Sequence, residues 1–371
     1  MGKLWKKNEV KVDIASYMHY IRGQKKVGKT TLFNDLVSYI GKGNMDFGLL
    51  ISLSDEDGYK TLDGLNVAVA PEWSDFIEVV DELVDNPEDN QFKFIALDTV
   101  DELIKIAIRE VFRLHKKQYG EVCESLNKAL GGYGSGRAKV IELVSAQIAR
   151  LKTGYGLFCI GHTKLRDVNE KGMNEAYQQL TTSLPFDFDS IFADKADIIA
   201  TVSIDKSIVD IEEIKTSKTT SKLVGSIGGV TRWIHFRDDN FNVDCGARFS
   251  EIIDKVELSA ENYIQAIEEA IKKASGKSDT EIKTKVLEEE TQRSEAVKKL
   301  SEKENEVDES INKKLIDYIT SNLTKLSDST KATVVSKVKE LEVKTFDDLI
   351  DKPTVKVKEI AKLMKDELGG E

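Results

Sequence analysis

The segment at residues 23–30 constrains this chain more than any other part of its sequence. Its letters, GQKKVGKT, fit the pattern G-x-x-x-x-G-K-[ST]. An apolar, strand-like run precedes it at 17–21, and apolar residues with helical spacing follow it between 32 and 40. Glycines let such a loop curl so that its backbone N–H groups face phosphate oxygens. The segment therefore predicts a strand, a phosphate-binding loop and a helix, in that order.

The residue types in this loop predict a site for a nucleotide and Mg²⁺. Lys29 would neutralise the β- and γ-phosphates, which also gives it a catalytic role, and the Thr30 hydroxyl would hold the metal ion. Lys25 and Lys26 add two further positive charges, which can contact the nucleotide or a neighbouring polymer. We assign nucleotide contacts to Gly23, Gln24, Lys25, Lys26, Val27, Gly28, Lys29, Thr30 and Thr31.

A second ligand for the metal ion is predicted at Asp98. A Mg²⁺–nucleotide site needs a carboxylate at the end of another buried strand, and the apolar residues 94–97 lead directly to this aspartate. Thr99 follows it, where a glutamate that activates water could have stood. Either hydrolysis is slow, or the catalytic carboxylate comes from another strand.

Glu56 is the candidate for that carboxylate. It follows an apolar, strand-like run at 49–53 and lies in an acidic turn. At the carboxyl end of a neighbouring strand it could orient a water molecule in line with the γ-phosphate and partly deprotonate it. An acidic surface turn closed by Gly58 is the simpler interpretation of the same letters. Glu102, one helical turn after Asp98, is a weaker alternative.

His162 is the histidine with the strongest functional context. It follows a strand-like run at 157–160, and a polar residue at such a strand end can sense the γ-phosphate by donating a hydrogen bond. We therefore include it among the catalytic candidates. His19 and His235 lie within strand-like runs, which predicts core or edge positions, and His115 is expected on a helix surface.

Short apolar runs that alternate with helical patterns indicate an α/β domain with a mostly parallel sheet covered on both faces. This pattern extends over residues 1–275. Residues 276–310 indicate a charged linker or exposed helix, because 277–310 contain no aromatic residue, proline or glycine. From 311 to 371 apolar residues return at helical spacing, which predicts a small helical C-terminal module. The strand-like runs are 17–21, 49–53, 92–97, 157–160, 198–203 and 233–236.

The composition disfavours several other classes of protein. The 371 residues carry 54 Lys and Arg against 65 Asp and Glu, a formal net charge of −11. This balance disfavours coating of nucleic acid by bulk charge but permits a local basic groove. No apolar run of about 18 residues exists, so a membrane span is not expected. Three distant cysteines form no disulfide or zinc framework, and the first residues lack an apolar signal segment, so we expect an intracellular protein.

Two further segments each permit two interpretations. Residues 131–137 (GGYGSGR) could present N–H groups to a phosphate or DNA backbone, with Tyr133 stacking on a base, or could form a hinge before a helix. Residues 215–222 (KTSKTTSK) are basic and contain no acid. They could form a hairpin or loop along a DNA path, or a solvated turn.

Six motifs, taken in order, resemble one family. They are GQKKVGKTT (23–31), SDEDGYKTL (54–62), IALDTVDEL (95–103), GGYGSGRAKV (131–140), FCIGHTK (158–164) and CGARF (245–249). Together they resemble the phage nucleotide-binding proteins with a RecA-type ATPase core, over about residues 10–272. The resemblance implies a RecA-like P-loop NTPase fold, ATP with Mg²⁺ at the loop, and Glu56 as the catalytic glutamate. The pair Lys26 and Val27 departs from the family, which usually has small residues there.

The resemblance also implies partners. The loop after His162, about residues 164–190, would lie near single-stranded DNA. Its basic members are Lys164, Arg166 and Lys171. Such proteins bind nucleotide between protomers, in a filament or ring, and often use a basic residue of the neighbouring protomer. Arg248 in CGARF is the favoured candidate for that residue, with Lys218 and Lys222 as alternatives.

The leading hypothesis is therefore a DNA-stimulated ATPase that acts on single-stranded DNA in phage recombination, annealing or replication, in the cytoplasm of the host cell. The alternative is a nucleotide-dependent switch or scaffold that recruits a protein partner through the C-terminal helices at 311–364. A small-molecule kinase ranks lower. Such enzymes close a lid with several arginines over the phosphates, whereas residues 164–190 contain a single arginine, Arg166.

Overall fold

The computed structural model of the protein describes residues 7–54, 58–87, 90–169, 176–215, 221–238 and 243–368. The chain divides into two compact units, each assembled from three stretches. The first unit comprises Met1–Pro71, Gln91–Leu103 and Tyr155–Thr291, and the second comprises Glu72–Asn90, Ile104–Gly154 and Gln292–Glu371. Within the described ranges, no helix is long and apolar enough to cross a membrane. The domain boundaries predicted after residues 275 and 310 stay predictions.

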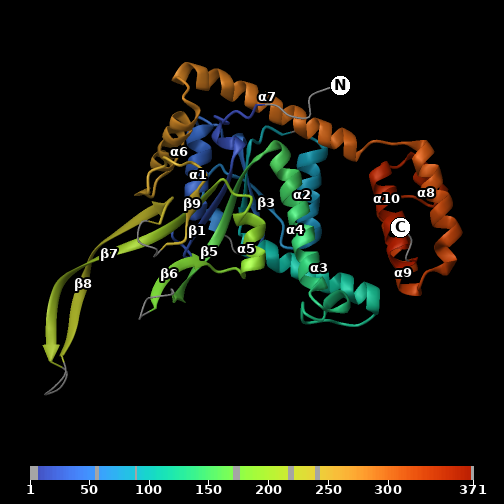
Figure 1. Cartoon of the computed structure of the whole chain (residues 1–371), viewed down its shortest axis with the longest axis horizontal. Coiled ribbons are helices and arrows are strands. Elements are labelled where there is room, and N and C mark those ends of the chain that lie inside the picture. The colour runs from blue at the N-terminus through green and yellow to red at the C-terminus, as the bar shows by residue number, and fades with distance from the viewer. Residues whose placement is uncertain are drawn as a thin grey trace. The chain divides into compact units, whose positions relative to one another are not determined.

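A mostly parallel mixed sheet flanked by helices forms the centre of the first unit, as the alternating pattern predicts (Figure 1). Across the sheet the strand order is β10-β8-β7-β1-β5-β4-β2-β3, with β9 beside β7 and β6 beside β5. The pairs β7–β8, β8–β10, β7–β9 and β5–β6 are antiparallel. The strands are β1 (Met18–Gly23), β2 (Gly48–Ser52), β3 (Asn66–Val69), β4 (Phe94–Asp98), β5 (Gly156–Val168), β6 (Tyr177–Thr182), β7 (Ile198–Lys215), β8 (Ser221–His235), β9 (Gly246–Ala247) and β10 (Lys255–Glu257).

The described helices divide between the two units. The first unit contains α1 (Lys29–Ile40), α5 (Phe186–Ala193), α6 (Ala260–Ser275) and the first half of α7 (Asp279–Glu304). The second contains α2 (Trp73–Asp85), α4 (Ser135–Gly154), the second half of α7, α8 (Glu309–Asn322), α9 (Asp328–Glu340) and α10 (Thr354–Leu368). The helix α3 (Val100–Tyr119) begins in the first unit and continues in the second.

The core of the first unit lies between the sheet and the helices α1 and α6. Helix α1 contributes apolar residues at helical spacing, with Leu32, Phe33 and Leu36 all buried. Helix α6 contributes a second apolar stripe that includes the fully buried Tyr263. Each buried apolar side chain of this size stabilises the fold by about 1.5–3 kcal/mol. This packing fixes the direction in which α1 leaves the phosphate loop.

The register of the parallel strands gathers the predicted site residues at one edge of the sheet. Gly23 at the end of β1 pairs with His162 of β5, and Asp98 at the end of β4 pairs with Ser52 at the end of β2. Because the carboxyl ends of parallel strands meet at one edge, ligands of open α/β sheets bind there. The phosphate loop, Asp98 and His162 therefore lie at the same edge of the sheet.

The segment expected as a loop at 164–190 is a hairpin followed by a helix in its described part, so that expectation is wrong. The strand β5 continues to Val168 and pairs antiparallel with β6, from Thr163 opposite Thr182 to Val168 opposite Tyr177. The helix α5 follows from Phe186. Threonines and other residues that favour strands explain the hairpin, because they suit a half-buried pleated surface.

The C-terminal helices of the second unit have an apolar core of their own. Buried residues of α8, α9 and α10 form it, among them Ile319, Val334 and Met364. A second feature of this unit corrects one expectation. His115 is buried rather than on the helix surface, because its Nδ1 accepts a hydrogen bond from the backbone N–H of Leu130 at 2.9 Å.

Candidate nucleotide-binding site

The phosphate loop needs glycine at both ends of its motif. A Cβ on Gly23 would lie 3.0 Å from the Val27 side chain and 3.1 Å from the Val202 side chain. Gly28 has a φ of +107°, in the left-handed region that favours glycine. Val27, which departs from the expected small residues, is buried against the core. Its packing anchors the middle of the loop while Lys25 and Lys26 remain exposed.

Lys29 is the first residue of α1, and its side chain is buried within the loop. Its ammonium donates hydrogen bonds to the backbone carbonyls of Gly23 and Gln24, both at 2.8 Å. A lysine held at the centre of a loop of backbone N–H groups is placed to contact phosphate oxygens. The geometry therefore suits the role predicted for Lys29.

Thr30 and Asp98 meet although 68 positions separate them in the chain. The Thr30 hydroxyl donates a hydrogen bond to Oδ2 of Asp98 at 2.8 Å. Hydroxyl and carboxylate oxygens are ligands that Mg²⁺ prefers, and this ion often uses few protein ligands beside phosphate oxygens. Among the described residues, no group of three or more His, Cys, Asp or Glu could hold a metal ion alone. The pair thus fits Mg²⁺ bound together with a nucleotide.

His162 is held at the edge of the sheet by a residue that the sequence did not single out. Its backbone N–H donates to Oδ2 of Asp101 at 2.9 Å. The other oxygen of this buried carboxylate accepts a hydrogen bond from the Ser183 hydroxyl. Asp101 therefore connects the start of α3 with β5 and with the segment after β6. Only its position one turn after Asp98 could have suggested this.

A buried charge cluster lies at the end of β1, next to the phosphate loop. Arg22 is 1% exposed, and its Nη1 lies 3.1 Å from Oδ2 of Asp244 and 3.9 Å from Oδ2 of Asp189. Tyr20 donates a hydrogen bond to Oδ1 of Asp189 at 2.9 Å. Burial raises the pKa of the Asp189 carboxyl, and the Arg22 guanidinium opposes this effect. The cluster fixes the strand end from which the loop starts.

Arg248 lies at the opposite edge of the sheet. Its backbone N–H donates to the Asp197 carbonyl, whereas Gly23 pairs with Val202, five residues further along β7. Five strand residues span about 17 Å. The side chain of Arg248 is 63% exposed and donates to the Asp194 carbonyl at 3.0 Å. Arg248 is therefore not beside the phosphate loop of its own chain.

Several candidates lie outside the described part of the structure. They are Glu56, Lys171, Lys218 and the side chain of Lys222. The strand β2 ends at Ser52, which pairs with Asp98. Glu102 lies in the first turn of α3, where its backbone N–H donates to the Thr99 hydroxyl. The catalytic role predicted for Glu56 stays a prediction. The glycine-rich segment at 131–137 belongs to the second unit and leads into α4, with Tyr133 fully exposed.

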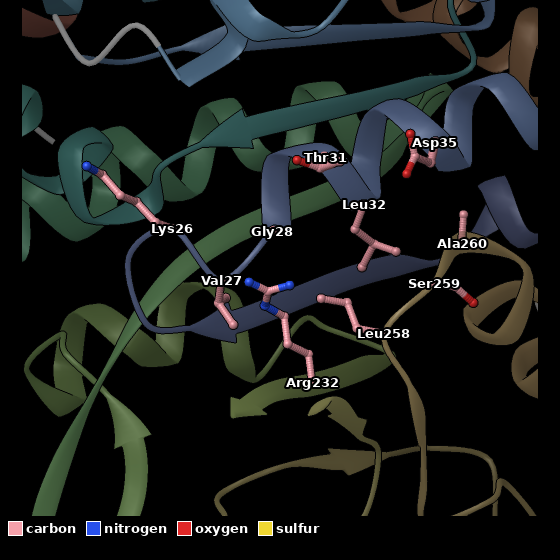
Figure 2. Close-up of a pocket in the computed structure, with 10 residues that line it drawn as sticks. All are labelled: Lys26, Val27, Gly28, Thr31, Leu32, Asp35, Arg232, Leu258, Ser259 and Ala260. Atoms are coloured by element: carbon pink, nitrogen blue, oxygen red, sulfur yellow. The ribbon is translucent and has the colours of Figure 1, made fainter. Parts of the chain in front are cut away.

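A pocket of about 360 Å³ adjoins the phosphate loop (Figure 2). Val27, Gly28 and the first turn of α1 form one side, and residues 258–260 at the start of α6 form another. Arg232 of β8 extends into it, with its guanidinium directed toward Val27 and Gly28. Sequence motifs could not predict this contribution, because Arg232 lies 201 positions after Thr31, another residue of the lining, and the two share no motif.

The sheet, the phosphate loop and the Thr30–Asp98 pair define an α/β P-loop NTPase. A family model described as an AAA domain matches residues 15–232, more than half of the chain, so the protein belongs to that family. Membership implies nucleotide binding and hydrolysis, usually with Mg²⁺. A search of curated proteins finds no match. The fold class predicted from the sequence is confirmed.

Proposed function

We propose that the protein is a DNA-stimulated ATPase that acts on single-stranded DNA in phage recombination, annealing or replication. The observation that carries this proposal is the course of β5. His162 lies beside Gly23 of the phosphate loop, and the same strand continues into a hairpin where Lys164 and Arg166 are exposed. A polymer bound to this hairpin would act on His162 through one continuous strand.

The residues at the sheet edge support hydrolysis in distinct ways. Bound Mg²⁺ polarises phosphate oxygens and neutralises developing charge, and Thr30 and Asp98 would hold it. Lys29 would exchange its contacts with the Gly23 and Gln24 carbonyls for phosphate oxygens. Glu56 would orient the attacking water. Asp101 holds the His162 backbone through a hydrogen bond, which would keep the ring in place to donate to the γ-phosphate.

Self-association supplies a role for Arg248. Its exposed guanidinium contacts Asp197 and the Asp194 carbonyl at the sheet edge opposite the phosphate loop, a position that suits contact with the nucleotide of a neighbouring protomer better than with its own. An arginine supplied in this way stabilises charge in the transition state of phosphoryl transfer. A filament or ring in which one protomer presents Arg248 to the next would satisfy this geometry.

Phosphate release from ATP, measured with and without single-stranded DNA, tests the proposal. DNA should raise the rate, and Lys29→Ala should lower it by about a hundredfold or more, because a phosphate-stabilising charge is lost. Replacing Lys164, Arg166 and Lys171 by alanine should abolish the DNA response but keep the basal rate. A matched control replaces Lys298, Lys299 and Lys303, exposed residues of α7, by alanine.

Three outcomes of this assay would contradict the parts of the proposal separately. A rate that does not respond to DNA would exclude the DNA-stimulated function. A triple variant with an intact DNA response would exclude the hairpin as the binding element. Wild-type turnover in Arg248→Ala would exclude its role in the neighbouring site.

A nucleotide-dependent switch is the second candidate function. The observation that favours it is the separate apolar core of α8, α9 and α10, which has its own buried residues and contains none of the phosphate-loop residues. Such a module could present a surface to a protein partner while the P-loop unit binds nucleotide. Removal of these helices, considered in the Discussion, distinguishes the two functions.

A further inference from the structure

The pocket beside the phosphate loop shares residues with the loop itself. Gly28 and Thr31 line both the loop and the pocket, and the lining then follows α1 outward to Asp35. Phosphate oxygens face the backbone N–H groups of such a loop. A pocket that continues from the same residues offers space for the part of the ligand attached to the α-phosphate.

Arg232 supplies a cation to this pocket. Among the described residues, its guanidinium has no hydrogen bond or ion pair, and it points toward Val27 and Gly28 (Figure 2). Its backbone is held firmly, because the Arg232 carbonyl accepts a hydrogen bond from the Leu258 N–H at 2.9 Å. The side chain is therefore available to a ligand while its origin on β8 is fixed.

The opposite surface of the pocket is apolar and closely packed on the loop. Cδ2 of Leu258 lies 3.4 Å from the position that a Cβ on Gly28 would occupy. Ala260 and Leu32 extend this apolar surface, and both are buried. An arginine plane facing aliphatic side chains suits a flat aromatic ring, because guanidinium groups stack on such rings.

The polar groups of the pocket suit a sugar and a base edge. The Asp35 carboxylate can only accept hydrogen bonds when ionised, so it requires a hydroxyl or amine donor. The volume of about 360 Å³ lies within the range of small-molecule sites. We propose that this pocket holds the nucleoside of the bound nucleotide, with the base between Arg232 and Leu258 and a ligand donor facing Asp35. This inference rests on nucleotide binding at the loop.

The consequence concerns the β7–β8 hairpin. Arg232 lies on β8, opposite Ile204 of β7. The pairing of β7 with β1 ends at Val202 and that of β8 with β10 ends at Trp233, so the hairpin continues beyond the rest of the sheet from this point (Figure 1). A base stacked on Arg232 would restrict the root of this hairpin. The nucleoside, and not only the γ-phosphate, would then affect a second element of the unit.

Equilibrium dialysis with Mg²⁺ and three ligands tests the inference: ATP, ADP and inorganic tripolyphosphate. Tripolyphosphate keeps the phosphates and lacks the nucleoside. Arg232→Ala should weaken ATP and ADP binding by about tenfold or more and leave tripolyphosphate binding unchanged. Leu258→Ala should shift the three affinities in the same pattern. Lys206→Ala, which removes a cation from the same hairpin outside the pocket, is the matched control and should bind all three as the wild type does.

Each other outcome would overturn the inference or the function beneath it. Wild-type ATP affinity in Arg232→Ala would exclude the nucleoside from this pocket. An equal loss of tripolyphosphate would assign Arg232 to the phosphates instead. A wild-type protein that binds neither ATP nor tripolyphosphate would contradict nucleotide binding itself, which separates that failure from the failure of the pocket assignment.

Discussion

His19 illustrates how burial in the core changes the chemistry of a histidine. Its ring is fully buried on β1, where Nδ1 lies 2.8 Å from the Tyr263 hydroxyl and Nε2 lies 3.1 Å from the Ile14 carbonyl. A carbonyl oxygen can only accept, so Nε2 carries the proton and Nδ1 accepts from Tyr263. Burial lowers the pKa of His19 to about 4, although the Ile14 carbonyl opposes the shift.

This pKa predicts a loss of stability in mild acid. The folded protein protonates His19 only near pH 4, whereas the unfolded chain does so near pH 6.5. The contribution of neutral His19 to the free energy of unfolding is therefore complete above about pH 6.5. Below this pH the free energy of unfolding falls by about 1.4 kcal/mol per pH unit, down to pH 4. Between pH 7.5 and 5.0, denaturant unfolding of wild type should lose about 2 kcal/mol more than that of His19→Gln. An equal pH dependence in the two proteins would contradict the assignment.

At the same scale, local motifs predicted part of the site and long-range contacts completed it. The loop motif around Lys29 and the apolar run before Asp98 were sufficient to predict a phosphate loop and a metal ligand. The hydrogen bond between Thr30 and Asp98 agrees with the prediction that both bind the metal ion. Arg232 and Asp101 could not be found in this way. Their roles depend on which strands become neighbours, and the sequence does not state strand order.

At the scale of elements, strands with continuous apolar runs were predictable. Runs at 94–97 and 157–160 became β4 and β5 because residues buried on both faces must all be apolar. The strand β3 was not predicted, because it is only four residues long and none of them is fully buried. The strand β6 is rich in Tyr, Gln and Thr and lacks an apolar run, so the sequence did not predict it. It forms by antiparallel pairing with the extended β5.

Helix α7 contains a buried contact that its charged sequence conceals. Glu289 is 1% exposed and accepts hydrogen bonds from the backbone N–H groups of Val12 and Asp13, at 2.9 and 3.2 Å. The Ser16 hydroxyl donates to the same carboxylate at 2.9 Å. One glutamate therefore holds the segment before β1 against the helix.

Removing this carboxylate should destabilise the first unit. Glu289→Ala leaves two backbone donors and one hydroxyl without their acceptor, which costs about 2–3 kcal/mol or more. Thermal or urea unfolding of this unit, followed through its buried aromatic residues, measures the change. Glu290→Ala, at the next position of α7, is the control and should unfold as the wild type does. A Glu289→Ala protein of unchanged stability would show that the contact contributes nothing.

At the scale of the whole molecule, the chain passes repeatedly between its two units. The first unit ends in the middle of α7, after Thr291, and two earlier excursions build the second unit. Changes in composition predicted domain boundaries after residues 275 and 310. Composition can divide a chain only into consecutive segments. Units defined by spatial contact need not follow chain order, so their discontinuous stretches could not be read from the sequence.

The arrangement of the site within one unit leads to a prediction for the C-terminal helices. Residues that line the phosphate loop, the Thr30–Asp98 pair and the pocket all belong to the first unit. A chain lacking residues 309–371 should therefore keep its ATP affinity and DNA-stimulated turnover within about twofold, because sites without shared partners behave independently. Dialysis and phosphate release measure both.

The same truncation distinguishes the two proposed functions when activity in cells is also measured. Intact turnover with lost recombination activity would favour the switch, since only the recruiting module is missing. Intact turnover with intact activity would favour the DNA-stimulated ATPase and leave α8, α9 and α10 without a required role. Lost turnover, in a truncated protein whose circular dichroism shows a folded first unit, would contradict the prediction and place the C-terminal helices in the catalytic cycle.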